Sequence, residues 1–161
     1  MIRTVNPTAD APGIADIYNR YIRETTVSFE TEPLSAAQMR ERIDGIADKY
    51  PYYVYETDGT VAGYAYVHPW KERTAYSGTL ETTIYLDPSY KHMGIGSKLM
   101  KHIADECRRR GYRVLIACIT GENTESIAFH KALGFRQASL FHNVGYKLGR
   151  LLDVVDMEYQ L

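Results

Sequence analysis

The chain has 161 residues, of which 45% are hydrophobic and 24% are charged, and this length and composition predict one soluble domain with a buried core. Its 19 Lys and Arg against 20 Asp and Glu leave a formal net charge of −1, which argues against a protein whose main partner is nucleic acid. No apolar run approaches the roughly 20 residues of a membrane span and the first residues lack the apolar core of a signal peptide, so we expect a cytoplasmic protein with no membrane partner.

The first part of the chain predicts a short strand and two helices. The strand covers Ile2–Val5, and Asp10 caps the helix that follows, with Pro12 in its first turn. A loop rich in Thr and Glu, Thr25–Pro33, precedes a second helix that Ser35 caps. Both helices carry apolar residues at spacings of three and four, so each has one face to bury.

Three strands are expected next. Tyr52–Glu56 and Val61–His68 flank Asp58-Gly59, a dipeptide that is typical of tight hairpin turns. The third strand, Leu80–Leu86, ends at Asp87-Pro88.

The last part of the chain alternates helices with strands. A long helix begins at Gly94 and ends at Gly111, with three arginines in its last turn. Val114–Ile119 is almost entirely apolar, as expected of a strand covered on both faces. The remaining expected elements are a helix over Asn123–Leu133 and strands over Phe135–Leu140 and Asp153–Tyr159. We predict a single α/β (α+β) domain over residues 1–161, a mixed twisted sheet of about six or seven strands flanked by about four helices.

The loop before the long helix carries the most chemistry. Its glycines, Gly94 and Gly96, let backbone N–H groups approach a ligand closely, and the helix N-terminus adds the positive end of its dipole. Lys91 and His92 can add charge, so the loop suits a phosphate or a pyrophosphate. The spacing fits neither a P-loop nor the three-glycine dinucleotide motif. A glycine helix cap without a ligand is the alternative.

This loop resembles motif A of the GNAT N-acetyltransferases, [RQ]-x-x-G-x-[GA], which holds the pyrophosphate of acetyl-CoA in that family. Lys91 stands at the Arg or Gln position, which keeps a donor but loses the bidentate fork. A second hallmark of the family follows at Asn123, Ser126 and the run Ala128–Phe135 (AFHKALGF). The order of the expected elements also matches, and the resemblance covers about residues 2 to 160.

Within the family, the chain most resembles the phosphinothricin and methionine sulfoximine acetyltransferases. The runs that carry this likeness are Thr26–Pro33 (TVSFETEP), Trp70–Tyr76 (WKERTAY), Leu80–Tyr85 (LETTIY), Gly145–Arg150 (GYKLGR) and Asp153-Val154. Leu151 departs from the pattern, because relatives often have Trp after Gly-Arg.

The resemblance implies acetyl-CoA as the acetyl donor and a set of residues that bind it. They are Thr83, Ile84, Tyr85 and Leu86 on the strand, Lys91, His92, Met93, Gly94, Ile95 and Gly96 in the loop, and Asn123 and Ser126 at the start of the next helix. The strand residues would act through their backbone groups. Asn123 can equally be a simple N-cap.

Two residues are candidates for proton transfer. Acetylation needs a neutral amine, so a general base must accept a proton. Glu81 is the one acid in its strand, where a carboxylate is costly to bury without a role, and the resemblance places it at the general base. His130 stands where many GNATs have a Tyr that protonates the leaving thiolate, and it can act as an acid or hold a water or the thiol. The alternatives are a surface charge and a packing histidine.

The resemblance also implies an acceptor site in the loops of the subgroup. Lys71 and Arg73 can pair with a carboxylate or phosphinate of the acceptor. The full expected set is Phe29, Glu30, Trp70, Lys71, Arg73, Tyr76, Leu80 and Thr82. Each charged member of the set can instead face water.

The predicted activity is direct acetyl transfer from acetyl-CoA to the primary amine of a small amino-acid-like substrate, without a metal. Cys107 and Cys118 have no base beside them in sequence, and we expect both to be buried free thiols. Relatives are homodimers with the pocket near the interface, and 14 Tyr against four Phe suit such surfaces. The alternatives are another acceptor (a polyamine, an antibiotic amine or a protein N-terminus) and a non-catalytic acetyl-CoA-binding module.

Overall fold

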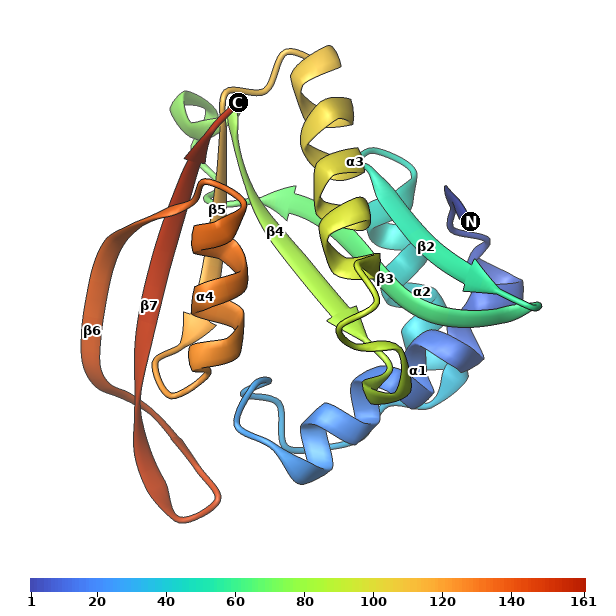
Figure 1. Ribbon diagram of the computed structural model, residues 1–161, viewed down its shortest axis with the longest axis horizontal. Helices are drawn as coiled ribbons and strands as arrows, with labels where there is room; N and C mark the ends of the chain where they lie inside the picture. Colours follow the sequence, from blue (N-terminus) through green and yellow to red (C-terminus); the bar gives the residue numbers. More distant parts are fainter.

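The computed structural model describes residues 1–161 and contains one seven-stranded mixed sheet in the order β1-β2-β3-β4-β5-β7-β6 (Figure 1). The strands are β1 (Ile2–Thr4), β2 (Tyr52–Thr57), β3 (Thr60–Pro69), β4 (Thr79–Leu86), β5 (Val114–Thr120), β6 (Arg136–Lys147) and β7 (Arg150–Gln160). Only β4 and β5 pair in parallel; every other neighbouring pair is antiparallel. The predicted fold class is confirmed.

Four helices cover the two faces of the sheet. They are α1 (Pro7–Glu24), α2 (Ala36–Ala47), α3 (Ile95–Arg109) and α4 (Thr124–Ala132), with short 3-10 turns η1 (Thr74–Tyr76) and η2 (Pro88–Tyr90). The helices α1 and α2 pack on a layer that includes Tyr52, Val54 and Tyr64, whereas α3 packs on the opposite face against Ala65 and Val67. No helix is both long enough and apolar enough to span a membrane.

The start of α1 differs from the prediction. Asn6, not Asp10, caps the helix, because its side chain accepts hydrogen bonds from the N–H groups of Thr8 and Ala9. Pro12 therefore lies inside the helix rather than in its first turn. Asp10 is 3% exposed and accepts two hydrogen bonds from the Arg3 guanidinium, at 2.7 and 2.8 Å. Its role is to hold β1 against α1.

The last two strands are longer than predicted and form a hairpin that projects from the sheet (Figure 1). They meet at a tight turn in which Leu148 and Gly149 have φ values of 52° and 77°. The register of β6 on β7 shifts between Phe141 and Gly145, so the strand continues through an irregularity instead of ending at the predicted Leu140.

The site depends on a separation between β4 and β5. Their parallel register covers only three pairs, from Thr79–Val114 to Glu81–Ile116. Beyond Glu81 the two strands diverge toward the loop between α1 and α2 (Figure 1). A sheet that opens in this way leaves the facing backbone groups of β4 without a strand partner.

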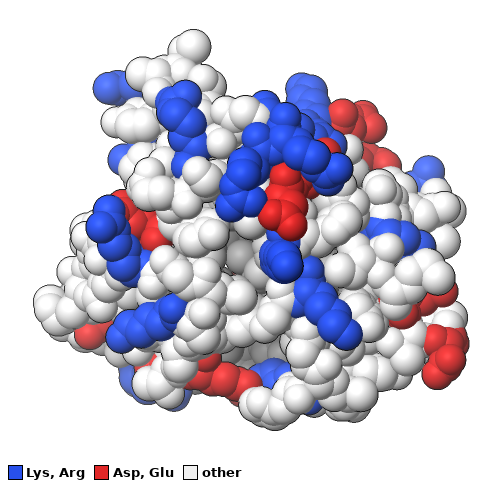
Figure 2. All heavy atoms as spheres, turned by 45° about the horizontal axis from the view of Figure 1, so that its top comes forward, with Lys and Arg blue, Asp and Glu red and all other residues white.

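Basic side chains gather on the face that carries the end of α3, with acidic side chains among them (Figure 2). Arg108, Arg109 and Arg110 pair there with Asp105 and Glu106 of the same helix. The three arginines therefore form local surface ion pairs, which contribute little to stability individually.

Candidate active site

Two adjoining cavities lie along β4 where it separates from β5. One has a volume of about 440 Å³ and contains Glu81 and His130 in its wall. The other has a volume of about 630 Å³ and lies over the start of α3. Both are lined by Ile84 and Asn123, among other shared residues, so they form one continuous path through the opening of the sheet.

The backbone of β4 faces this path. The carbonyl of Thr79 accepts a hydrogen bond from Trp70 N–H at 3.5 Å, and Asp87 N–H donates to Ala62 O at 2.9 Å. The backbone groups of the odd-numbered residues of β4 therefore bond to β3. Since backbone groups alternate sides along a strand, Ile84 and Leu86 direct theirs into the gap. Leu86 O accepts a hydrogen bond there from the Tyr21 hydroxyl at 2.7 Å. These groups can bind an extended chain of amides.

The larger cavity ends at an anion-binding loop. Gly94, with φ 75°, is the N-cap of α3, and the loop also holds His92 at φ 60°. The Lys91 ammonium lies 3.0 Å from Glu125 Oε2, so one cation and one carboxylate stand at the mouth of the cavity. Free N–H groups at a helix N-terminus favour a phosphate group, which makes the loop suitable for the pyrophosphate of a coenzyme.

Most of the residues predicted to bind acetyl-CoA lie along this path. Those lining the larger cavity are Ile84, Tyr85, Leu86, Lys91, His92, Gly94, Ile95, Gly96, Asn123 and Ser126. Thr83 lines the smaller cavity, whereas Met93 is 61% exposed and lines neither. Asn123 also caps α4 by accepting a hydrogen bond from Ser126 N–H, so the same residue caps the helix and lines the cavity.

Glu81 is half-buried at the last paired position of β4. Burial raises the pKa of its carboxyl above the usual value; the His68 ring opposes this increase when it is protonated, and the charge of Asp156 adds to it. A carboxylate with a raised pKa is a stronger base than an exposed one. The position suits a group that must accept a proton.

His130 lies on the other side of the gap, on α4, and is 3% exposed. Its Nδ1 is 2.8 Å from Ser126 O, and because a carbonyl only accepts, Nδ1 carries the hydrogen in the neutral ring. Burial lowers the pKa of His130, and the bond to Ser126 opposes this. The Phe129 and Phe135 rings pack edge-on against the imidazole.

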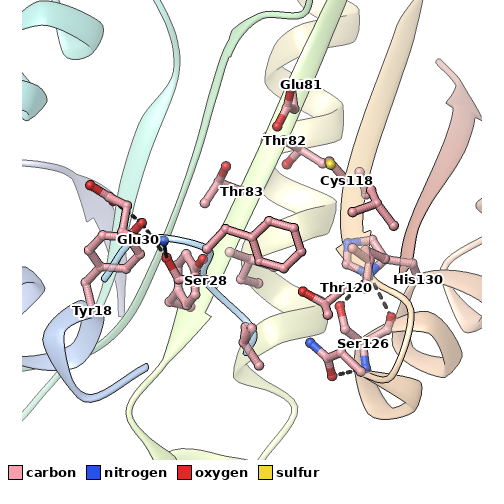
Figure 3. A pocket seen from close by; sticks show the side chains of 18 residues that line it. Tyr18, Ser28, Glu30, Glu81, Thr82, Thr83, Cys118, Thr120, Ser126 and His130 are labelled. Carbon is pink, nitrogen blue, oxygen red and sulfur yellow. Dashed lines mark hydrogen bonds between the residues drawn. The ribbon is translucent and has the colours of Figure 1, made fainter. Parts of the chain in front are cut away.

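A third wall comes from α1 and the loop that follows it. Figure 3 shows Tyr18, Ser28 and Glu30 opposite Thr120 and His130. Arg42 donates two hydrogen bonds to Glu30, at 2.5 and 2.8 Å, and together with the Tyr18 hydroxyl these bonds lower the pKa of Glu30. Glu30 is therefore an ionised wall residue. Phe29 and Thr82 line the same cavity, as predicted for acceptor-site residues.

The structure does not bring the other predicted acceptor residues into the cavity. The loop from Trp70 to Gly78 packs on itself: Trp70 and Tyr76 meet edge to face at 5.4 Å, and the Lys71 ammonium lies 4.2 Å from the centre of the Trp70 ring. Arg73 precedes the turn η1 and does not line the cavity either. Leu80 is 1% exposed and belongs to the hydrophobic core. Within one chain, the predicted anion clamp is not assembled.

Several residues of the wall were not predicted from the sequence, among them Tyr18, Cys118 and Thr120. Tyr18 follows the apolar spacing of α1, which indicated a core residue. Cys118 was expected to be buried, but it is exposed because β5 leaves β4 just before it. The surrounding cavity wall still withdraws its thiol from much of the solvent, and this desolvation raises its pKa to about 12. The chain has no cluster of three or more His, Cys, Asp or Glu side chains that could hold a metal ion.

An open sheet, a glycine-capped helix start at one end, and a carboxylate and an imidazole in one cavity wall at the other suit a group-transfer enzyme. Residues 2–155 match the family model for the acetyltransferase (GNAT) domain. The chain belongs to the GNAT acetyltransferase family, as its motifs predicted.

Named relatives and solved structures agree with this assignment. The chain is 37% identical over 146 residues to the phosphinothricin N-acetyltransferase of Streptomyces viridochromogenes, covering 91% of this chain and 80% of that protein. It is 34% identical over 158 residues to the L-methionine sulfoximine/L-methionine sulfone acetyltransferase of Salmonella typhimurium, covering 95% and 90%. The crystal structure of a GNAT superfamily phosphinothricin acetyltransferase from Sinorhizobium meliloti in complex with AcCoA has a TM-score of 0.95 and 37% identity, covering 100% and 88%.

Proposed function

We propose that this chain transfers acetyl from acetyl-CoA to the primary amine of a small amino-acid-like acceptor of the phosphinothricin or methionine sulfoximine type. The observation that carries the proposal is the continuous path from the α3 loop to the wall that holds Glu81 and His130. The path accommodates the pyrophosphate at its α3 end and an acceptor of limited size at the other. The names of relatives at 34–37% identity support the acceptor class.

In this proposal each residue has a defined task. The ammonium of the acceptor must lose a proton before it attacks, and Glu81 accepts that proton directly or through a water. The outward-facing N–H of Ile84 is available to the thioester carbonyl, where a donor stabilises developing negative charge. Neutral His130 presents Nε2 as a hydrogen-bond acceptor for the thiol or for a water beside it.

The test is a free-thiol assay of coenzyme A release with a panel of amines. The panel contains phosphinothricin, methionine sulfoximine, methionine sulfone, spermidine and a short peptide. Turnover confined to the three amino-acid analogues supports the proposal. Turnover on spermidine or the peptide alone would support acetyl transfer from acetyl-CoA but contradict the proposed acceptor class. Binding of acetyl-CoA without turnover on any amine, seen as a raised Tm, favours a non-catalytic binding module.

We also propose that the chain acts as a homodimer in the cytoplasm. Six large apolar side chains on the β6–β7 hairpin are 45–71% exposed: Leu140, Phe141, Val144, Tyr146, Leu148 and Leu151. Large exposed apolar side chains on a projecting hairpin are typical of protein interfaces. A second copy would also offer its own Lys71 and Arg73 to the assembly. Sedimentation analysis tests the dimer: the double change Val144→Asp and Tyr146→Asp should give a monomer from a dimeric wild type, and a monomeric wild type contradicts the proposal.

A further inference from the structure

A third cavity lies beneath α2, on the same face of the sheet as Glu81. It has a volume of about 450 Å³, and its walls include Tyr52, Tyr64, Tyr66, Arg42 and His68. The Tyr52 and Tyr66 rings stack at 4.7 Å, and Arg42 is held by Glu30. Tyrosine hydroxyls and a cavity of this size suit a group of water molecules. We call this space the tyrosine chamber.

His68 links the tyrosine chamber to the base. It lies directly opposite Glu81 in the antiparallel register of β3 and β4, and His68 Nε2 is 3.8 Å from Glu81 Oε1. His68 lines the tyrosine chamber, whereas Glu81 lines the cavity that contains His130. The two side chains therefore connect the two cavities, which also share Tyr18 in their walls.

The ring of His68 is held in the orientation that a relay needs. Its Nδ1 is 3.0 Å from the carbonyl of Pro69, and since a carbonyl only accepts, Nδ1 carries the hydrogen of the neutral ring. The lone pair of Nε2 consequently faces the Glu81 carboxyl. A gap of 3.8 Å closes through a small rotation of either side chain or through one bridging water.

The reaction itself requires a proton outlet. An ammonium and a thioester become an amide and a thiol: the N–C bond forms, the C–S bond breaks, one ammonium proton ends on sulfur and one is released. Glu81 must discharge that second proton before the next turnover. We propose that His68 passes it from Glu81 to water in the tyrosine chamber, a positioning and relay role that rests on the proposed function.

The other groups around Glu81 do not offer the same outlet. Cys118 on β5 holds its own proton, because burial raises its pKa to about 12. Asp156 on β7 is a second negative charge whose field raises the pKa of Glu81. On the chamber side the positive charge of Arg42 is compensated by its bidentate bond to Glu30. His68 is the neighbour that can both accept a proton and reach solvent, being one-third exposed.

The experiment compares the wild type with His68→Ala and His68→Asn in steady-state acetylation of the best amine from the panel. Asn keeps a donor near Pro69 O but removes the atom that faces Glu81. We expect kcat to fall at least ~10-fold in both variants, with the KM for acetyl-CoA unchanged. Added imidazole should restore much of the kcat of His68→Ala, because it can occupy the vacated space and carry the proton. If the substitution lowered kcat only by disturbing the local structure, added imidazole would not restore kcat.

His102→Ala is the matched control, because His102 lies on α3 and packs against Tyr53, away from the site. The kcat of His102→Ala should equal that of the wild type and should not change when imidazole is added. Wild-type kcat in both His68 variants across pH 6–9, or a loss in His68→Ala that imidazole does not reverse, overturns the relay. A wild type that turns over no amine overturns the proposed function instead, so the two failures are distinguishable. If His68→Ala lowers the Tm, the His68→Asn variant decides the comparison of kcat.

Discussion

Replacing Gly94 with Ala tests whether the α3 loop binds the coenzyme. Gly94 has φ 75°, and a Cβ built there has no atom within 4 Å, so the added methyl projects into open space at the wall of the larger cavity. The left-handed conformation costs an Ala about 1–2 kcal/mol, which lowers the Tm of a chain of this size by about 2–8 °C. We expect an additional loss in acetyl-CoA affinity of at least ~10-fold, or about 1.4 kcal/mol, because the methyl separates the phosphates from the backbone N–H groups.

Gly59 provides a matched control for the backbone cost. It has the same φ of 75° and the same open surroundings, but it lies in the β2–β3 turn away from both cavities. Gly59→Ala and Gly94→Ala should therefore lose similar amounts of Tm in scanning fluorimetry without ligand. Only Gly94→Ala should show weaker acetyl-CoA binding by calorimetry. Equal affinity in the two variants would refute the placement of the pyrophosphate at this loop.

Two further predictions concern ionised carboxylates. Glu81→Gln should lower kcat by ~100-fold or more and remove the acid limb of the pH–rate profile, which in the wild type lies above the usual carboxyl range because burial raises the pKa of Glu81; an unchanged profile would exclude Glu81 as the base. Asp10→Asn should destabilise the fold by about 2 kcal/mol at neutral pH, since it removes the carboxylate that accepts two hydrogen bonds from Arg3. Burial is the largest single effect on the pKa of Asp10 and acts to raise it, but the bonds from Arg3 and Asn6 N–H and the charge of Arg3 together outweigh it, so the pKa is lowered in the fold. The contribution of Asp10 is therefore present above the unfolded pKa of about 3.9 and is lost as pH falls through the lower folded value. The Tm difference between Asp10→Asn and wild type should shrink below about pH 4, and a constant difference would contradict this account.

The periodic parts of the fold were predictable from sequence, and the exceptions have long-range causes. The face of α3 that carries Leu99 and Ile103 is fully buried, as its spacing indicated. The start of α1 was misplaced because Asp10 is a good local cap whose actual partner, Arg3, lies on a strand. The adjacent pair Asn6-Pro7, a cap followed by Pro at the first helical position, was the available signal. The end of β6 was missed because its pattern breaks at the shift in register after Phe141.

The candidate site was predictable where a motif is contiguous and unpredictable where chain segments meet. Gly94 and Gly96 could be recognised within one loop. The opening of the sheet could not, because a strand as apolar as β5 suggests cover on both faces, whereas the loss of pairing after Ile116 exposes Cys118 to the cavity. Lys71 does not line the cavity of its own chain for a related reason, since its loop forms an internal aromatic cluster. Neither the opening of the sheet nor the packing of the Lys71 loop is indicated by the local sequence.

The role of His130 follows from which of its nitrogens carries hydrogen. Its Nδ1 donates to Ser126 O, and burial lowers its pKa, so at neutral pH the ring is neutral and Nε2 is an acceptor. An acid role would require the imidazolium, and kcat would then fall as pH rises through a value below 6.5. An acceptor role predicts no such fall. We therefore expect His130→Phe to lower kcat at least ~10-fold while the wild-type kcat does not decline between pH 6 and 8. A wild-type decline in that range, abolished in His130→Phe, would instead assign the proton of the leaving thiol to His130.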